Sequence, residues 1–165
     1  MRDGGEWTLF SPSDTPDLPE IYGAAFDKKY EEYEAMADRG EIKLWKRMPA
    51  SDLWKKMIGM LFETGHPWIC FKDPSNIRSP QDHMGVIHSS NLCTEIMLNT
   101  SDNETAVCNL GSINIAKFVT KSKTIDKDLL QKVIRSSVRM IDNTVDINYY
   151  PTDDSKASNM KHRPI

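Results

Sequence analysis

The residues best suited to chemistry are Asn91, Cys93 and Glu95, which lie at positions i, i+2 and i+4 of one short segment. In an extended backbone alternate side chains share a face, so an amide, a thiol and a carboxylate would line up over about 13 Å. Leu92 and Thr94 would then point the other way. A thiol between a proton acceptor and a hydrogen-bonding amide suits removal of hydrogen from an alcohol carbon of a small polar substrate.

A plainer interpretation of the same segment is a buried structural cysteine beside a solvated Glu95 and an Asn91 in a turn. Free cysteine is among the most buried residue types, so spacing alone favours this alternative.

The elements that must position these residues begin after a turn-rich lead-in over residues 1–19, in which only 7–10 is expected to be extended. Residues 20–39 are predicted to form a helix that ends at Gly40. Its apolar positions recur at steps of four, four, three and four, at Tyr22, Phe26, Tyr30, Tyr33 and Ala37.

A second helix is predicted from a cap at Ser51 or Asp52 to Gly65, with Pro67 beyond it. Its apolar stripe is Leu53, Met57, Met60 and Leu61. Residues 68–71 (Trp-Ile-Cys-Phe) are predicted to form a short buried strand in which Cys70 is a small buried hydrophobe. Residues 83–88 are compatible with either strand or loop.

The last third of the chain is predicted to hold an extended region over 106–119, interrupted by Gly111, and then a third helix capped by Asp126. That helix carries an apolar stripe and should end before Tyr149-Tyr150-Pro151. The tail 151–165 is polar and lacks periodicity. The stripe consists of Leu130, Ile134, Val138, Ile141 and Val145.

The order helix, strand, loop, strand, helix predicts an α/β fold, but two or three strands cannot close an α/β barrel. We therefore expect residues 1–165 to be one segment of a larger fold, with an incomplete parallel sheet. In this division 1–19 is lead-in, 20–150 holds the helices, strands and reactive loop, and 151–165 is the tail.

The composition and the residue pattern argue against several classes of function. The chain has 165 residues, a formal charge of −3 and 39% hydrophobic residues, which fits a globular protein and argues against a dedicated nucleic-acid partner. No apolar run approaches the roughly 20 residues that span a bilayer. Three widely spaced cysteines without a signal peptide predict reduced thiols and a cytoplasmic location. The four histidines show no zinc-ligand spacing, so no metal site is expected.

Two motifs carry a family resemblance: Asn-Leu-Cys-Thr-Glu-Ile at 91–96 and Val-Cys-Asn-Leu-Gly-Ser-Ile-Asn at 107–114. Together they resemble the catalytic core of the ribonucleotide reductase large subunit, in its class I, two-subunit form. The similarity extends upstream to 7–12 and 22–26, and to Thr-Gly-His-Pro at 64–67 with Asp73 and Asn76. It covers nearly all of the chain and implies a segment of a ten-stranded α/β barrel.

The resemblance also implies roles. Cys93 matches the cysteine that becomes a thiyl radical and abstracts the 3′ hydrogen of the ribose, and Glu95 matches the base that takes the 3′-hydroxyl proton. Asn91 matches the amide that hydrogen-bonds the ribose hydroxyls, and Cys108 matches one of two redox cysteines. Residues 91–95, from Asn91 through Leu92, Cys93 and Thr94 to Glu95, would then contact substrate.

The family's other parts are not matched. No cysteine precedes Cys70 to serve as redox partner of Cys108, and Tyr149-Tyr150 is not expected to be the family's radical-relay pair. The family's phosphate loop, relay tyrosines and nucleotide-sensing domain have no counterpart here.

The resemblance implies a ribonucleoside diphosphate substrate, a metal-containing small subunit that supplies the radical, and electrons from thioredoxin or glutaredoxin. It also implies a large-subunit dimer and a complementary large-subunit fragment, since the chain alone is expected to be inactive. Two alternatives stay open. One is a catalytically inactive remnant or split-gene fragment that acts only after assembly, and the other is a different thiyl-radical enzyme of glycyl-radical type.

Overall fold

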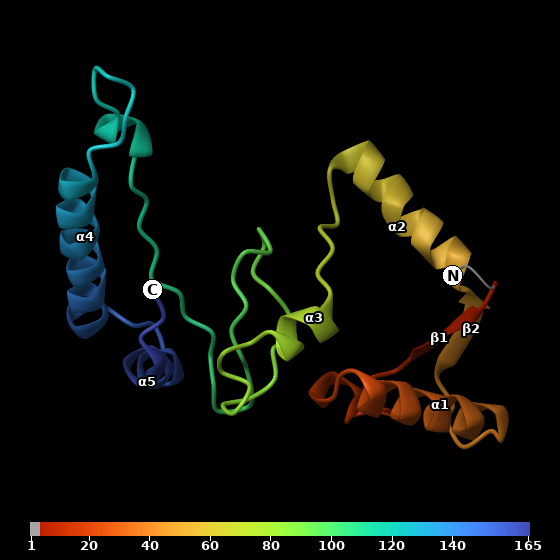
Figure 1. The fold of residues 1–165 in the computed structure, drawn as a ribbon. Coiled ribbons are helices and arrows are strands. Elements are labelled where there is room, and N and C mark those ends of the chain that lie inside the picture. The colour runs from red at the N-terminus through yellow and green to blue at the C-terminus, as the bar shows by residue number, and fades with distance from the viewer. Residues whose placement is uncertain (1–3) are drawn as a thin grey trace. The chain divides into compact units, whose positions relative to one another are not determined.

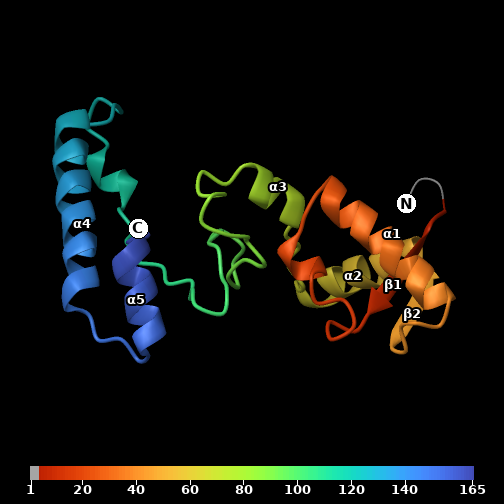
Figure 2. The same ribbon diagram turned by 90° about the horizontal axis from the view of Figure 1, so that it is seen from below.

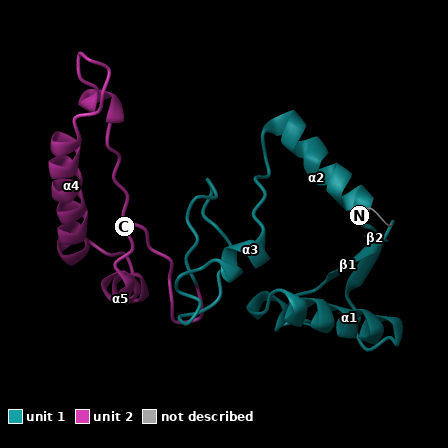
Figure 3. Ribbon diagram, viewed as in Figure 1, with its two compact units in different colours: residues 1–99 teal, residues 100–165 magenta. Residues whose placement is uncertain are grey.

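The computed structural model describes residues 4–165, so the first three residues of the predicted lead-in lie outside it. The chain divides into two compact units, residues 1–99 and 100–165 (Figure 3). None of the helices in the described part is long and apolar enough to cross a membrane.

The first unit begins with an antiparallel pair, β1 (Glu6–Phe10) and β2 (Trp45–Pro49), in which Glu6 lies opposite Pro49 (Figure 1). This is the only sheet in residues 4–165. The predicted extended piece at 7–10 is therefore confirmed, whereas β2 was not predicted. The expectation of a parallel sheet is wrong, because the two strands run in opposite directions.

Helix α1 (Ala24–Asp38) packs beside this pair and buries Tyr33 and Ala37 with Ile42. It begins four residues later than predicted, because Leu18–Glu20 forms a separate 3₁₀ helix. Gly40 follows the helix with φ 79°, the left-handed conformation predicted for it.

A polar network joins the strands to α1. The Thr8 hydroxyl donates to Glu34 Oε1 at 2.6 Å and accepts from Arg47 Nε at 3.0 Å. The Tyr30 hydroxyl donates to the Thr8 carbonyl, and burial raises the pKa of Tyr30. Thr8 is 2% exposed, so β1 buries its polar residue and leaves its larger apolar neighbours partly exposed.

Helix α2 (Ala50–Thr64) starts directly after β2, one to two residues before the predicted caps, and ends at Gly65 as predicted. Residues 68–71 do not form the predicted strand. Trp68, Cys70 and Phe71 are exposed, so the expected burial of Cys70 is also wrong. No partner strand lies against this segment in the described residues, and a lone apolar run cannot form a ladder.

Helix α3 (Lys72–Ile77) follows, and an irregular segment leads from it through the reactive residues to the end of the unit (Figure 2). Residues 83–88, compatible with strand or loop from sequence, are loop.

In the second unit the long helix α4 (Lys127–Ile147) is confirmed, including its cap, since Asp126 accepts a hydrogen bond from the Leu129 amide at 3.0 Å. The predicted extended region 106–119 contains no strand and ends in a 3₁₀ helix, Ile115–Phe118. The tail is not irregular but forms α5 (Asp153–His162).

Candidate functional site

The segment that carries Cys93 is a tight turn rather than the predicted extended strand. The Thr94 amide donates to the Asn91 carbonyl at 3.2 Å, and Thr94 has φ 65°. A turn of this kind ends the alternation of side chains, so the predicted alignment along one extended face is wrong.

The turn nevertheless brings two of the three predicted groups together. Asn91 Nδ2 donates to Glu95 Oε1 at 2.7 Å, and Asn91 Oδ1 accepts from the Ile96 amide at 3.1 Å. The Ser90 hydroxyl donates to the Ile96 carbonyl at 3.0 Å and closes the base of the turn. One asparagine side chain therefore fixes both the carboxylate and the backbone around Cys93.

Cys93 lies between the paired residues as a free, exposed thiol, and the adjacent Leu92 is 94% exposed. The alternative interpretation is therefore wrong in burying Cys93, but its expectation that Asn91 lies in a turn is confirmed. The arrangement can present a thiol, an oriented carboxylate and an amide to a molecule that covers the turn, but it does not by itself exclude water.

Helix α3 binds the backbone segment that lies just before α1 in the sequence. Lys72 Nζ donates to the carbonyl groups of Leu18, Pro19 and Ile21, and burial lowers the pKa of Lys72. Asp73 Oδ1 accepts from the Gly23 amide at 3.0 Å. The family motif pointed to Asp73 from sequence, but no spacing signal identified Lys72.

Cys108, the predicted redox cysteine, belongs to the second unit and is half-buried. The residue after it is firmly held: Asn109 Nδ2 donates to Asn159 Oδ1 and to the Pro164 carbonyl, both at 2.8 Å. Asn159 is fully buried and also donates to the Tyr150 hydroxyl at 2.6 Å. Helix α5 thus fixes the backbone that follows Cys108.

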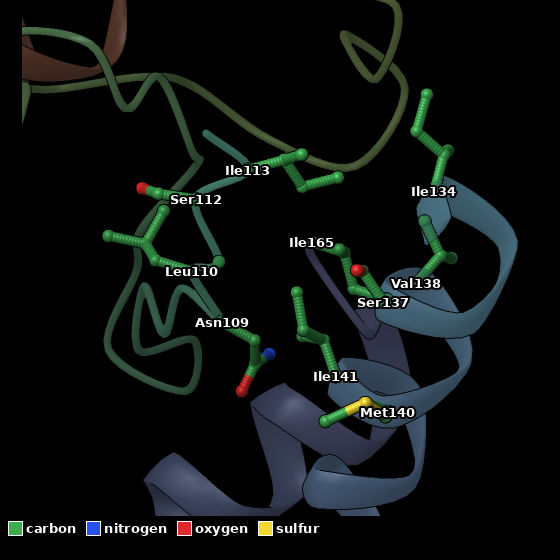
Figure 4. Close-up of a pocket in the computed structure, with 11 residues that line it drawn as sticks. Asn109, Leu110, Ser112, Ile113, Ile134, Ser137, Val138, Met140, Ile141 and Ile165 are labelled. Carbon is green, nitrogen blue, oxygen red and sulfur yellow. The ribbon is translucent and has the colours of Figure 1, made fainter. Parts of the chain in front are cut away.

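A groove of about 340 Å³ lies between residues 109–113 and α4 in this unit (Figure 4). Its lining is mainly apolar, and Ile141 reaches from α4 toward the facing segment, close to Gly111. Three residues of the stripe predicted from sequence, Ile134, Val138 and Ile141, therefore face the segment that follows Cys108.

Charged pairs secure the end of the second unit. The Glu104 carboxylate accepts hydrogen bonds from Lys161 and His162. Both bonds hold the pKa of Glu104 below its usual range, and the bond from Lys161 has the larger effect. The Arg163 guanidinium pairs with Asp146 at 2.7 Å and with Asp142 at 2.8 Å, which lowers the pKa of Asp146.

No group of three metal-ligating side chains occurs within residues 4–165. Four lysines of the second unit, Lys117, Lys121, Lys123 and Lys127, are exposed to solvent.

Comparison with known proteins identifies the chain along its whole length. A family model described as "Ribonucleotide reductase, barrel domain" matches residues 1–165. The ribonucleoside-diphosphate reductase subunit alpha of Chlamydia trachomatis is 56% identical over 165 residues, which are 100% of this chain and 16% of that protein.

Two relatives with lower identity are also large subunits of ribonucleoside-diphosphate reductase. The ribonucleoside-diphosphate reductase large chain of Cryptosporidium parvum is 44% identical over 161 residues, 97% of this chain and 19% of that protein. The large subunit of Danio rerio is 41% identical over 165 residues, 100% of this chain and 20% of that protein. The chain thus spans about a sixth to a fifth of the length of these relatives. Together with the mixed helices and the unclosed sheet, the barrel-domain match confirms the predicted fold class, a partial α/β barrel.

Proposed function

The chain belongs to the ribonucleotide reductase family, in its barrel domain, and from this premise we propose that it is part of a catalytic subunit that reduces ribonucleoside diphosphates by thiyl-radical chemistry. The observation that carries the proposal is the turn in which Asn91 holds Glu95 at 2.7 Å beside the exposed Cys93 thiol. The turn presents the three groups of the family motif, which occupy every second residue of the sequence from Asn91 to Glu95.

In this function Cys93, as a sulfur radical, takes the 3′ hydrogen of the ribose, so that an S–H bond forms as the C3′–H bond breaks. Glu95 accepts the proton of the 3′ hydroxyl, and the Asn91 amide keeps its carboxylate oriented toward that proton. The radical comes from a small subunit that contains a metal, which lies outside this chain.

The electrons for reduction come from thiols. Cys108 and a second cysteine outside this chain join in a disulfide, and the two electrons and two protons that they give up replace a ribose hydroxyl by hydrogen and release that hydroxyl as water. Thioredoxin or glutaredoxin then reduces that disulfide by thiol–disulfide exchange. The free thiols of Cys70 and Cys93 support the cytoplasmic location that we propose for this step, since disulfides are rare in that compartment.

Because the turn is exposed, the chemistry requires further protein segments that cover it. A carboxylate acts as a base most effectively where water is largely excluded, yet Leu92 and Cys93 are exposed. We propose that further segments of a large subunit, or a complementary fragment, cover the turn in a dimeric enzyme.

A chimera tests the proposal. Residues 1–165 replace the matching segment of the chlamydial subunit alpha, and reduction of a ribonucleoside diphosphate is measured with the small subunit and thioredoxin present. The parent chimera should turn over and its Cys93→Ser variant should not. Cys70→Ser, which alters the other exposed cysteine, is the matched control and should retain activity.

Two outcomes would contradict the proposal. Turnover by Cys93→Ser at the parent rate would remove Cys93 from the mechanism. A chimera that binds substrate and small subunit yet shows no turnover would favour the alternative of an inactive remnant.

A further inference from the structure

Asn76 in α3 is a buried side chain whose hydrogen bonds are all directed at backbone. It is 3% exposed, and its Oδ1 accepts from the Ile87 amide at 2.8 Å. Its Nδ2 donates to the Ile87 carbonyl at 2.9 Å and to the Lys72 carbonyl at 3.0 Å. A single side chain therefore pairs with both backbone groups of Ile87, as a neighbouring strand would.

Ile87, the residue that Asn76 binds, lies just before the reactive turn in the sequence. Ile87 is itself 3% exposed, and three residues separate it from Asn91. The turn then closes on itself through Ser90, Asn91 and Ile96, and makes no strand pairing within residues 4–165. The backbone that enters the turn is consequently held by a side chain rather than by a sheet.

The helix that provides Asn76 is itself fixed. Lys72 and Asp73 bind the backbone of residues 18–23, and His88 Nε2 lies 2.9 Å from Glu20 Oε1. Helix α3 thus links the segment ahead of α1 to the residue that precedes the turn.

We propose that Asn76 is a positioning residue for the catalytic turn, and that it acts through the backbone of Ile87 to set where Asn91, Cys93 and Glu95 lie. The catalytic meaning of this inference rests on the proposed function. The positioning itself can be measured without turnover, so the two can fail separately.

The experiment uses the full 165-residue chain and residue-resolved amide hydrogen exchange. The Ile87 amide checks the direct contact. The amides of Thr94 and Ile96 check the proposal, because Asn76 touches neither of them, while amides of α1 report the stability of the unit.

Asn76→Ala removes both bonds to Ile87. We expect protection at Thr94 and Ile96 to fall about tenfold, the effect of losing one to two hydrogen bonds, with α1 protection unchanged. Ile77→Ala, at the adjacent exposed position of the same helix, is the matched control and should leave all these amides as in the parent.

Asn76→Asp adds a pH signature within one protein. Its carboxylate still accepts from the Ile87 amide but cannot donate to the Ile87 carbonyl, and burial beside that carbonyl raises the pKa of the new carboxyl. Protection at Thr94 and Ile96, relative to the parent at the same pH, should therefore be lost at pH 7 and recovered at about pH 4, where a protonated carboxyl donates again.

The proposal is overturned if Thr94 and Ile96 keep parental protection in Asn76→Ala, or if the parent shows no protection at Ile87. It is also overturned if α1 loses protection by the same factor as the turn in Asn76→Asp at pH 7. If Asn76→Ala does not fold, the pH dependence of Asn76→Asp decides, and its absence refutes the positioning role.

Discussion

Gly111 lies so close to α4 that a side chain at this position would meet Ile141. A Cβ atom at this position would lie 2.6 Å from Ile141 Cδ1 and 3.5 Å from Ile141 Cγ1. The first distance is a clash and the second is an ordinary contact. Gly111→Ala must therefore displace the end of the flexible Ile141 side chain, which the neighbouring groove can accommodate, at a cost of about 0.5–1.5 kcal/mol, typical of a side chain moved off its rotamer.

Ile141→Val removes the Cδ1 atom that causes the clash. Alone it should cost about 0.5 kcal/mol, the low end for loss of one methylene, because Ile141 is only half-buried. If the two changes were independent, the double variant would lose the sum, about 1–2 kcal/mol. Because the clash is absent in the double variant, we expect a loss of only about 0.5 kcal/mol and thus a favourable coupling of about 0.5–1.5 kcal/mol.

The assay must report on the second unit. All four tryptophans precede residue 69, so their fluorescence follows the first unit, and exchange of α4 amides is the appropriate probe. Gly59→Ala in α2 is the matched control, since a Cβ there meets nothing within 4 Å. It should leave α4 unchanged and stabilise α2 by about 0.5–1 kcal/mol.

Additive losses in the double variant would refute this reasoning, because they would mean that Gly111 and Ile141 do not meet. The segment after Cys108 would then not pack on α4 as described.

Further predictions concern the site and the isolated chain. In the chimera, Glu95→Gln should lower kcat by about 10²–10⁴ by removing the base, with folding intact by circular dichroism. Because Lys161 and His162 lower the pKa of folded Glu104, its stabilisation is complete above the unfolded pKa and is lost as pH falls below about 4. Glu104→Gln should therefore flatten the acid limb of a stability–pH curve measured by urea unfolding. The lone chain contains Cys108 but no second cysteine that matches the family's redox pair, so it should show no reduction, and any detectable deoxyribonucleotide would contradict this. Its exposed apolar faces should make it associate in size-exclusion runs, whereas a clean monomer with a sharp melt would count against this prediction.

A helix could be predicted from the sequence where apolar residues at helical spacing followed a capping residue. Helix α4 has both, with Asp126 as cap and a stripe that includes the fully buried Val145. Helix α5 escaped prediction because it buries Ser155, Ser158 and Asn159 rather than apolar residues. The polar side chains of this helix form hydrogen bonds instead, such as Ser158 with the Thr105 amide and Asn159 with the Asn109 side chain, and these leave no hydrophobic period in the sequence.

Strand β2 and the backbone of the reactive turn were also not predictable from the sequence. Strand β2 is short and mostly exposed, so no alternation marked it. At the site, residue types indicated which groups matter, but the backbone was predicted to be extended. It forms a turn because the Asn91 side chain accepts from the Ile96 amide. Asparagine commonly closes turns in this way, and a pattern of alternate residues cannot distinguish that from a strand.

The most direct test of Cys93 as the hydrogen-abstracting group is a kinetic isotope effect in the chimera with substrate deuterated at the 3′ carbon. If Cys93 breaks the C3′–H bond, the parent should turn over the deuterated substrate more slowly than the protonated one, and Cys93→Ser should give no product from either. Product formation by Cys93→Ser with the same isotope effect as the parent would show that another group removes this hydrogen, and would contradict the proposed role of Cys93.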